Sequence, residues 1–235
     1  MGALPPGGAS APRLGRERTL RLAHRGDHRR HPENSLAAIV GAVEVPGCDG
    51  VEFDVRASRD GVPVIVHDET LARVQGRPDA VAELTAAELE ALGVPRLEDA
   101  LAALPHRAFL DVELKEALGR AVVEVLAAGR GPDLHNAVIS SFDPRAIARI
   151  RGLAPGWPCW LNAAELEPAT IRAAVDLGCT GVSVQWRTLG PVAVAAAGAA
   201  GLAVAAWTVT ARSVYARLVE LGVAAICVEG KALEG

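Results

Sequence analysis

Ionisable side chains stand at the C-terminal ends of several apolar runs in this chain. His24 follows Leu-Arg-Leu-Ala, Glu52 and Asp54 lie within Val-Glu-Phe-Asp-Val, and His67 follows Val-Ile-Val. Apolar runs rich in Val and Ile build buried strands, where a charged group costs desolvation free energy unless it has a chemical role. Acids and histidines gathered at strand ends therefore predict a metal-assisted hydrolytic site.

The carboxylates are spaced so that they share faces of their strands. Residues two apart in a strand point the same way, so Glu52 and Asp54 would face the mouth of the fold together, and Asp111, Glu113 and Lys115 would share a second face. Clustered carboxylates raise one another's pKa unless a cation keeps them ionised. Because oxygen ligands suit hard divalent ions, Mg²⁺ or Ca²⁺ is expected, with Mn²⁺ as a further candidate. The alternative is an exposed face of an edge strand.

The histidines and two cations complete the candidate site. His24 or His67 alone would be read as a structural histidine, but a pair flanking a metal-bound substrate could supply a general acid and a general base. Arg25 could clamp a phosphate with two hydrogen bonds. Lys115 would act as a point charge or as an amine nucleophile, or either cation would only balance nearby acids. The remaining histidines lie in polar stretches and are expected to be solvated: His28, His31, His106 and His135.

Strand-like and helix-like segments alternate along the chain and must position these residues. Eight β-α units in 235 residues favour a closed TIM (β/α)8 barrel of one domain, with an open doubly wound sheet as the alternative. An additional piece from Asp68 to Arg96 predicts a short insertion after the second strand, with a hairpin-like return and a helix. The expected strands are Leu20–His24, Gly50–Val55, Ala108–Glu113, Ala137–Ser140, Trp157–Leu161, Thr180–Val184, Leu202–Trp207 and Ala224–Val228.

Pro, Gly and cap residues punctuate the expected helices. Pro144 stands at the start of one helix, and Gly129, Gly178 and Gly222 stand where helices should stop. The helices predicted from this punctuation and from apolar spacing are 35–45, 85–92, 145–151, 165–176, 192–200 and 211–221.

Charge and cysteine content exclude several function classes. The net charge is −4 with acids and bases interleaved, and no basic stripe with aromatic residues occurs, so nucleic acid is not expected as a partner. The four cysteines lack close spacing and mostly lie in or beside apolar segments. They predict small buried thiols rather than disulfides or a zinc site.

The N-terminal stretch, residues 1–18, is rich in Pro, Gly and Ala and reads as a flexible tail without the apolar centre of a signal peptide. Every later apolar run is interrupted by Gly, Pro or charge before it reaches the length of a membrane span. A cytoplasmic location without a stable membrane anchor is the expectation.

A series of short motifs resembles the glycerophosphodiester phosphodiesterase family in order and spacing over nearly all of Leu20 to Glu229. Each motif alone is weak, but their succession is specific. The motifs are His24-Arg25-Gly26, Pro32-Glu33-Asn34-Ser35, Glu52-Phe53-Asp54-Val55, Asp60-Gly61, His67-Asp68, Leu71-x-Arg73, Glu113-Leu114-Lys115, Ser141-Phe142 and Trp207-Thr208-Val209.

The resemblance implies a TIM barrel over residues 19–235 that hydrolyses small-molecule glycerophosphodiesters to glycerol 3-phosphate and an alcohol with a divalent cation. By position, the metal ligands would be Glu52, Asp54 and Glu113, and the acid-base pair would be His24 and His67. Phosphate charge would be stabilised by Arg25 and Lys115, while Trp207 would pack against the glycerol or the leaving group. The oligomeric state is not specified by these motifs.

Three departures from the family pattern concern the rim of the expected site and hence substrate preference. Ser35 replaces the usual Thr, Thr210 replaces the usual Asn, and Cys227-Val228-Glu229 replaces Ile-Thr-Asp. The short insertion suggests a more open pocket. Two other classes stay open: an aldolase-type barrel with Lys115 as a Schiff-base amine, and a barrel that only binds phosphorylated ligands.

Overall fold

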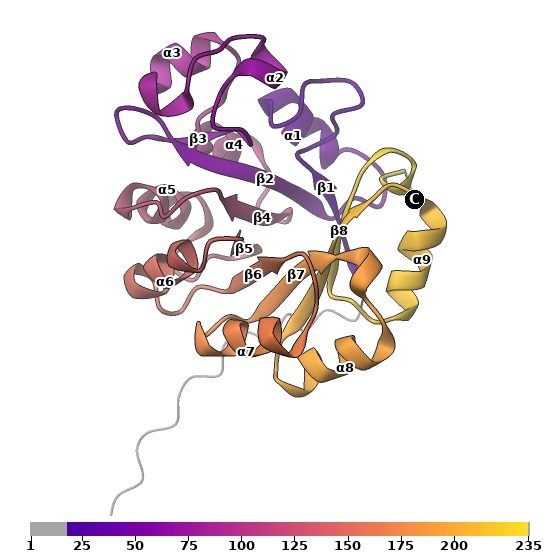
Figure 1. Cartoon of the computed structure of the whole chain (residues 1–235). Helices are drawn as coiled ribbons and strands as arrows, with labels where there is room; N and C mark the ends of the chain where they lie inside the picture. Colours follow the sequence, from indigo (N-terminus) through magenta and orange to yellow (C-terminus); the bar gives the residue numbers. More distant parts are fainter. Residues whose placement is uncertain (1–17, 235) are drawn as a thin grey trace, which may run out of the picture.

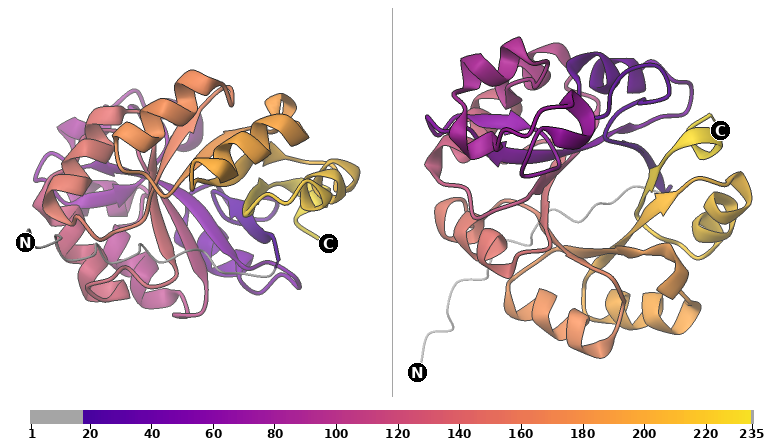
Figure 2. Two further views of the ribbon diagram at one scale, coloured as in Figure 1. Left: turned by 90° about the horizontal axis from the view of Figure 1, so that it is seen from below. Right: turned by 45° about the horizontal axis from the view of Figure 1, so that its top comes forward.

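Eight parallel strands close into a barrel, with the helices around it (Figures 1 and 2). The structure is a computed structural model that describes residues 18–234. The ring runs β1, β2, β4, β5, β6, β7, β8, β9 and closes through the pairing of β1 with β2, which confirms the TIM barrel and excludes the open sheet. Its strands are β1 Leu20–His24, β2 Gly50–Ala57, β4 Phe109–Leu114, β5 Ala137–Ser141, β6 Cys159–Ala163, β7 Gly181–Gln185, β8 Ala203–Val209 and β9 Ala225–Val228.

Helices cover the outside of the ring because alternate strand residues, such as Val51, Phe53 and Val55 of β2, present apolar side chains to them. These outward residues form two extended clusters with the helices. The α-helices are α1 Leu36–Ala42, α2 Ala72–Gln75, α3 Ala86–Ala91, α4 Leu97–Ala103, α5 Arg120–Arg130, α6 Pro144–Leu153, α7 Pro168–Asp176, α8 Pro191–Ala199 and α9 Arg212–Glu220. Short 3₁₀ turns occur at η1 Val81–Glu83, η2 Trp186–Thr188 and η3 Gly230–Ala232.

The barrel interior changes character along the strands. Side chains near the strand starts form an apolar plug in which the rings of Phe109 and Trp160 stack with centroids 6.1 Å apart. Further along β4, on the same face as Phe109, come Asp111 and Glu113. An apolar base thus supports a polar layer at the carboxyl ends of the strands, which is the end of this fold where active sites are found.

The insertion after β2 has a small core of its own. Strand β3 Pro63–Ile65 pairs antiparallel with β2, and α2, η1 and α3 follow it, lying together beside β2 in Figure 1. A cluster that includes Val64, Leu71 and Leu89 holds this segment together. A capping box between Thr85 and Glu88 begins α3. The predicted insertion is therefore present, although its return strand starts before Asp68.

Most element boundaries agree with the sequence predictions within a few residues, with specific exceptions. Gly178 and Gly222 follow their helices with φ of 68° and 79°, as predicted, whereas Gly129 lies inside α5. A Cβ at Gly129 would meet the Cβ of Leu101 at 2.9 Å, so this glycine permits close helix packing and the predicted stop is wrong. β6 begins two residues later than predicted, and Trp157, which precedes it, donates its indole Nε1–H to the carbonyl of Pro132.

All four cysteines are free thiols. Cys159 and Cys227 are buried, as predicted, whereas Cys48 and Cys179 are only partly buried. In the described part of the chain, none of the helices has the length and apolar character needed to cross a membrane. The predicted tail, residues 1–18, lies outside the described residues except for Arg18.

Candidate active site

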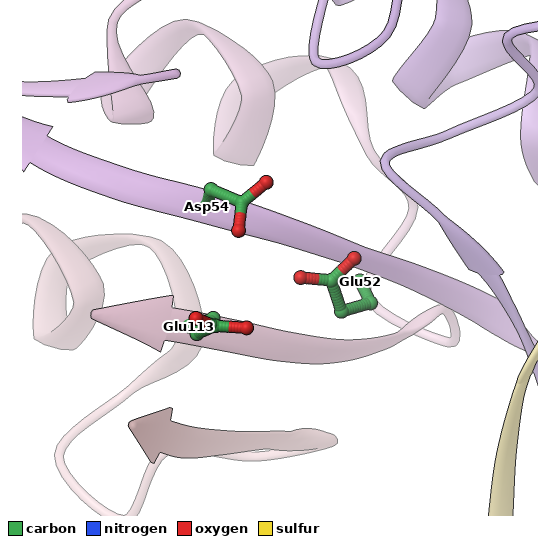
Figure 3. A group of neighbouring side chains, drawn as sticks. All are labelled: Glu52, Asp54 and Glu113. Carbon is green, nitrogen blue, oxygen red and sulfur yellow. The ribbon is translucent and has the colours of Figure 1, made fainter. Parts of the chain in front are cut away.

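Three carboxylates converge at the carboxyl end of the barrel. Glu52 and Asp54 project from β2 and Glu113 from the neighbouring β4, and the three point toward one another (Figure 3). One carboxylate oxygen from each lies within 4.8 Å of the other two, close enough to contact a common ion. The pairing of β2 with β4 produces this arrangement, because Asp54 lies opposite Glu113 in the register.

Burial and mutual repulsion set the charge state of this cluster. Burial raises the pKa of Glu52 well above its ordinary value, and the charges of Asp54 and Glu113 raise it further. Burial and the charge of Asp54 likewise raise the pKa of Glu113. Asp54 is also buried, but Lys115 and Arg25 outweigh that effect and lower its pKa. Two of the three carboxylates are therefore pushed toward their protonated forms, which is the rise in pKa that their clustering predicts.

Lys115 lies against these acids. Its Nζ is 2.9 Å from Oδ1 of Asp54 and also contacts Glu113. Although burial disfavours the ammonium, the charges of Asp54 and Glu113 raise the pKa of Lys115. The lysine is therefore cationic at neutral pH.

The loop after β1 wraps around the acids. The backbone N–H of Arg25 donates to the carbonyl and to Oε2 of Glu52, at 2.8 and 3.0 Å. The guanidinium Nε of Arg25 lies 3.3 Å from Oδ2 of Asp54. The turn requires left-handed backbone at Arg25 and at Gly26, where a Cβ would come within 2.5 Å of the carbonyl carbon of Ala38.

Asn34 orients one of the acids. Its buried Nδ2 donates to Oδ2 of Asp54 at 2.7 Å. In the sequence, Asn34 stands out only as part of the Pro32-Glu33-Asn34-Ser35 motif, and Ser35 is the residue that caps α1. The signal was present in the Pro-Glu-Asn motif, but its contact with β2 depends on the tertiary structure.

His24 forms a dyad with Glu229, the residue that follows the last strand, β9. Its Nδ1 lies 2.5 Å from Oε1 of Glu229, and its Nε2 lies 3.8 Å from Oε2 of Glu52. The hydrogen bond with His24 lowers the pKa of Glu229. Nε2 of His28 is 3.6 Å from the same Glu229 oxygen, and the His28 ring is partly buried, so the prediction of a solvated His28 is wrong.

His67 forms a second dyad within the insertion. Its Nδ1 lies 2.7 Å from Oδ1 of Asp68, while its carbonyl accepts from Nε of Arg56 at 3.0 Å. Burial lowers the pKa of His67, so this imidazole is neutral at pH 7. Both predicted histidines thus have Nδ1 on a carboxylate.

An aromatic pair borders the cavity above the acids. The rings of Phe142 and Trp207 meet edge to face with centroids 5.5 Å apart, and Phe142 is 48% exposed. In the sequence, Phe142 stands out only as part of the Ser141-Phe142 motif. The cavity has a volume of about 210 Å³, and seven of the eight predicted site residues line it: His24, Arg25, Glu52, His67, Glu113, Lys115 and Trp207. Asp54, the eighth, is buried beside them.

Further polar groups line the same cavity. Asp111, Asn162 and Ser183 are all buried there. Burial raises the pKa of Asp111 to about 7, so this carboxyl is partly protonated at neutral pH. The sequence placed Asp111 on the face of Glu113 without assigning it a role, and single residues such as Asn162 and Ser183 carried no signal.

Comparisons with known proteins agree with this geometry. The chain is 30% identical over 162 residues to a glycerophosphodiester phosphodiesterase of Caldanaerobacter subterraneus, covering 59% of this chain and 64% of that protein. It is 32% identical over 222 residues to a Mycobacterium tuberculosis protein named "Probable glycerophosphodiester phosphodiesterase 1", covering 80% of this chain and 81% of that protein.

Solved structures show the same fold. A phosphodiesterase of Oleispira antarctica, in complex with the product sn-glycerol-3-phosphate, superposes with a TM-score of 0.81 at 28% identity, covering 90% of this chain and 93% of that one. A glycerophosphodiester phosphodiesterase of Agrobacterium tumefaciens gives 0.79 at 26% identity, covering 92% and 98%. The model of the glycerophosphoryl diester phosphodiesterase family matches residues 24–230. This chain therefore belongs to the glycerophosphoryl diester phosphodiesterase family, a family of phosphoric diester hydrolases.

Proposed function

We propose that this protein hydrolyses glycerophosphodiesters to glycerol 3-phosphate and an alcohol, with a divalent cation bound by Glu52, Asp54 and Glu113. The observation that carries the proposal is the convergence of these carboxylates, with ligand atoms within 4.8 Å of one another, beside two imidazoles. The glycerol 3-phosphate in the Oleispira relative supports the product assignment.

The donor set fits a hard divalent ion. All three candidate ligands are carboxylates, and Oε1 of Glu52 is buried without a hydrogen-bond partner among the described residues. Mg²⁺, Ca²⁺ and Mn²⁺ prefer such oxygen ligands. Bound there, the cation would polarise a phosphoryl oxygen and a glycerol hydroxyl.

The two histidines would transfer the protons of the reaction. His67 is suited to accept a proton from the attacking hydroxyl, because its lowered pKa keeps it neutral and Asp68 holds its Nδ1. His24 is suited to protonate the departing alkoxide, because the Glu229 carboxylate holds its Nδ1 and so fixes the ring with Nε2 beside Glu52. The attacking hydroxyl belongs either to water or to the glycerol 2-position.

Cations and rings would hold the substrate. Arg25 and Lys115 would offset charge that develops on the phosphoryl oxygens. Trp207 and Phe142 would border the glycerol or the leaving alcohol.

Four unpaired cysteines support a reducing, cytoplasmic location for this activity on a small-molecule substrate.

The Schiff-base alternative is disfavoured by the environment of Lys115. A nucleophilic amine must be neutral, whereas the two carboxylates beside Lys115 raise its pKa. Nothing in the cavity favours a purely binding role, since both dyads and all three carboxylates are intact.

Release of glycerol 3-phosphate from a panel of glycerophosphodiesters tests the proposal. The protein would be treated with chelator and then given Mg²⁺, Mn²⁺ or Ca²⁺. We expect activity that chelator abolishes and a divalent ion restores. Full activity in excess chelator would reject the metal site, and inactivity on every diester with every ion would reject the substrate class.

A further inference from the structure

A chain of ion pairs joins Arg25 to His67, two residues that line the proposed site. It runs from Arg25 to Glu33, from Glu33 to Arg73, from Arg73 to Asp68 and from Asp68 to His67. Arg25 and Glu33 belong to the loop between β1 and α1, whereas Arg73 lies in α2 of the insertion. These ion pairs therefore hold the insertion against the loop that carries Arg25.

Arg73 is the central link of this chain. Its Nη1 and Nη2 donate to the two oxygens of Glu33 at 2.8 and 2.7 Å, and its Nε donates to Oδ2 of Asp68 at 2.6 Å. All three guanidinium nitrogens are thus used. Only a planar fork of fixed donors can satisfy two carboxylates in this way, which a lysine ammonium cannot reproduce.

Each of the two carboxylates that Arg73 holds also forms a hydrogen bond with a side chain that lines the cavity. The second oxygen of Asp68 accepts from Nδ1 of His67, which fixes the ring's tautomer and leaves Nε2 for a substrate proton. Oε1 of Glu33 accepts from Nη1 of Arg25 at 2.8 Å, while Nε of Arg25 faces Asp54. The orientation of Arg25 is therefore set from both sides.

Both carboxylates are ionised throughout the physiological range. Hydrogen bonds from Arg73 lower the pKa of Asp68 to about 2. Burial opposes ionisation of Glu33, but hydrogen bonds and charge from Arg73 and Arg25 lower its pKa to about 2 as well. The ion pairs of Arg73 with Asp68 and Glu33 therefore persist at any pH at which the histidines could act.

We propose that Arg73 is a positioning residue that orients His67 through Asp68 and Arg25 through Glu33, a role that rests on the proposed function. Neither Arg73 nor Glu33 lines the cavity that holds the acids. The Arg73 side chain is 48% exposed, and exposed ion pairs contribute little to folding stability. Removal of the Arg73 side chain should therefore lower the turnover rate strongly and change the free energy of unfolding only slightly.

A second arginine of the insertion, Arg77, provides a matched control. Arg77 lies in the same insertion and is 51% exposed, and among the described residues its side chain pairs only with Asp79, at 2.8 Å. We expect Arg73→Ala to lower kcat/KM by about 10- to 100-fold, as for loss of a group that orients catalytic residues, and Arg77→Ala to leave it unchanged. Arg73→Lys should recover only a small part of the loss, because it keeps the charge and loses the fork.

Chemical rescue distinguishes positioning from a general structural effect. A second cavity, of about 280 Å³, is lined by Glu33, Asp68 and Arg73 together with His67, so a free guanidinium ion can reach the position vacated in Arg73→Ala. Millimolar guanidinium should restore activity to Arg73→Ala. It should not restore activity to the double variant Arg73→Ala, Asp68→Asn, nor raise that of Arg77→Ala.

A kinetic double-mutant cycle completes the test. If Arg73 acts on His67 through Asp68, the double variant should lose less activity than the product of the two single losses, because the Asp68 branch is removed in both single variants and only the branch through Glu33 adds to it. Wild-type kcat/KM in Arg73→Ala, or losses that multiply, would overturn the proposal. Should Arg73→Ala not fold, full activity in Arg73→Lys would overturn it instead. A wild-type protein inactive on every diester would reject the function, not the role of Arg73.

Discussion

The carboxylate of Glu229 lies 2.5 Å from Nδ1 of His24, although 205 residues separate them in the chain. The contact exists because β1 pairs with β9, so that the first and last strands of the barrel end side by side. The family pattern that this chain resembles has Asp at the position of Glu229. The longer side chain still reaches the imidazole, which makes Glu229 a partner of His24 rather than a residue that only affects substrate preference at the rim.

Replacing Glu229 by Gln should lower kcat by about 10- to 100-fold, because the carboxylate that holds Nδ1 of His24 and orients the ring is lost. Initial rates at saturating diester measure this effect. Glu229→Asp, which restores the carboxylate, should retain much more activity than Glu229→Gln. Equal activity of the two variants would show that the charge at this position is not used.

Glu113→Gln should abolish divalent-ion binding or weaken it strongly and lower turnover by orders of magnitude, since it removes one of three converging carboxylates. Isothermal titration calorimetry with Mg²⁺, Mn²⁺ and Ca²⁺ measures the binding. The fold should persist, because burial already raises the pKa of Glu113 and its charge is unfavourable without an ion. Glu124→Gln on the outer helix α5 is a suitable control, and unaltered ion affinity in Glu113→Gln would contradict the ligand assignment.

The metal-free protein should lose stability as pH rises from about 4 to about 7. Asp111 has a pKa of about 7 in the folded state against an ordinary value of 3.8, so the folded state binds more protons than the unfolded state across this window. Stability therefore falls with pH there, by up to about 4 kcal/mol for this one group.

Asp111→Asn should reduce that slope and raise the free energy of unfolding at pH 8 relative to the wild type, while Glu52 and Glu113 keep the remainder of the slope. Urea denaturation at pH 5 and pH 8, both in chelator, measures the difference. A variant whose stability changes with pH as steeply as the wild type's would assign the slope to the other acids.

Phe142→Ala should raise KM for glycerophosphodiesters several-fold with little change in stability, since the ring is 48% exposed and contacts Trp207 at the border of the cavity. Diester saturation curves and thermal unfolding measure the two effects. Val192→Ala is the control, because that side chain is 84% exposed and does not line the cavity. An unchanged KM in Phe142→Ala would place the substrate away from the aromatic pair.

Local patterns predicted the framework of the site. Alternation with period two placed Glu52 and Asp54 on the inner face of β2, and helix signals marked most of the segments between strands. These features depend on residues a few positions apart, which is the range over which backbone geometry repeats. Helix α5 shows where such local patterns fail. Gly129 resembles a helix stop in the sequence, but in the structure it lies inside the helix and allows close packing against Leu101.

Local sequence patterns therefore specify the alternation of strands and helices, the parity that turns the acids inward, and the motifs that resemble one enzyme family. Which of these groups contact one another depends on the folded barrel. It joined Glu229 to His24, Asn34 to Asp54 and Arg73 to Glu33, pairs separated by 20 to 205 residues. The physical reason is barrel closure, which brings the ends of distant strands and their loops to one rim, where side chains select partners by distance and charge rather than by position in the chain.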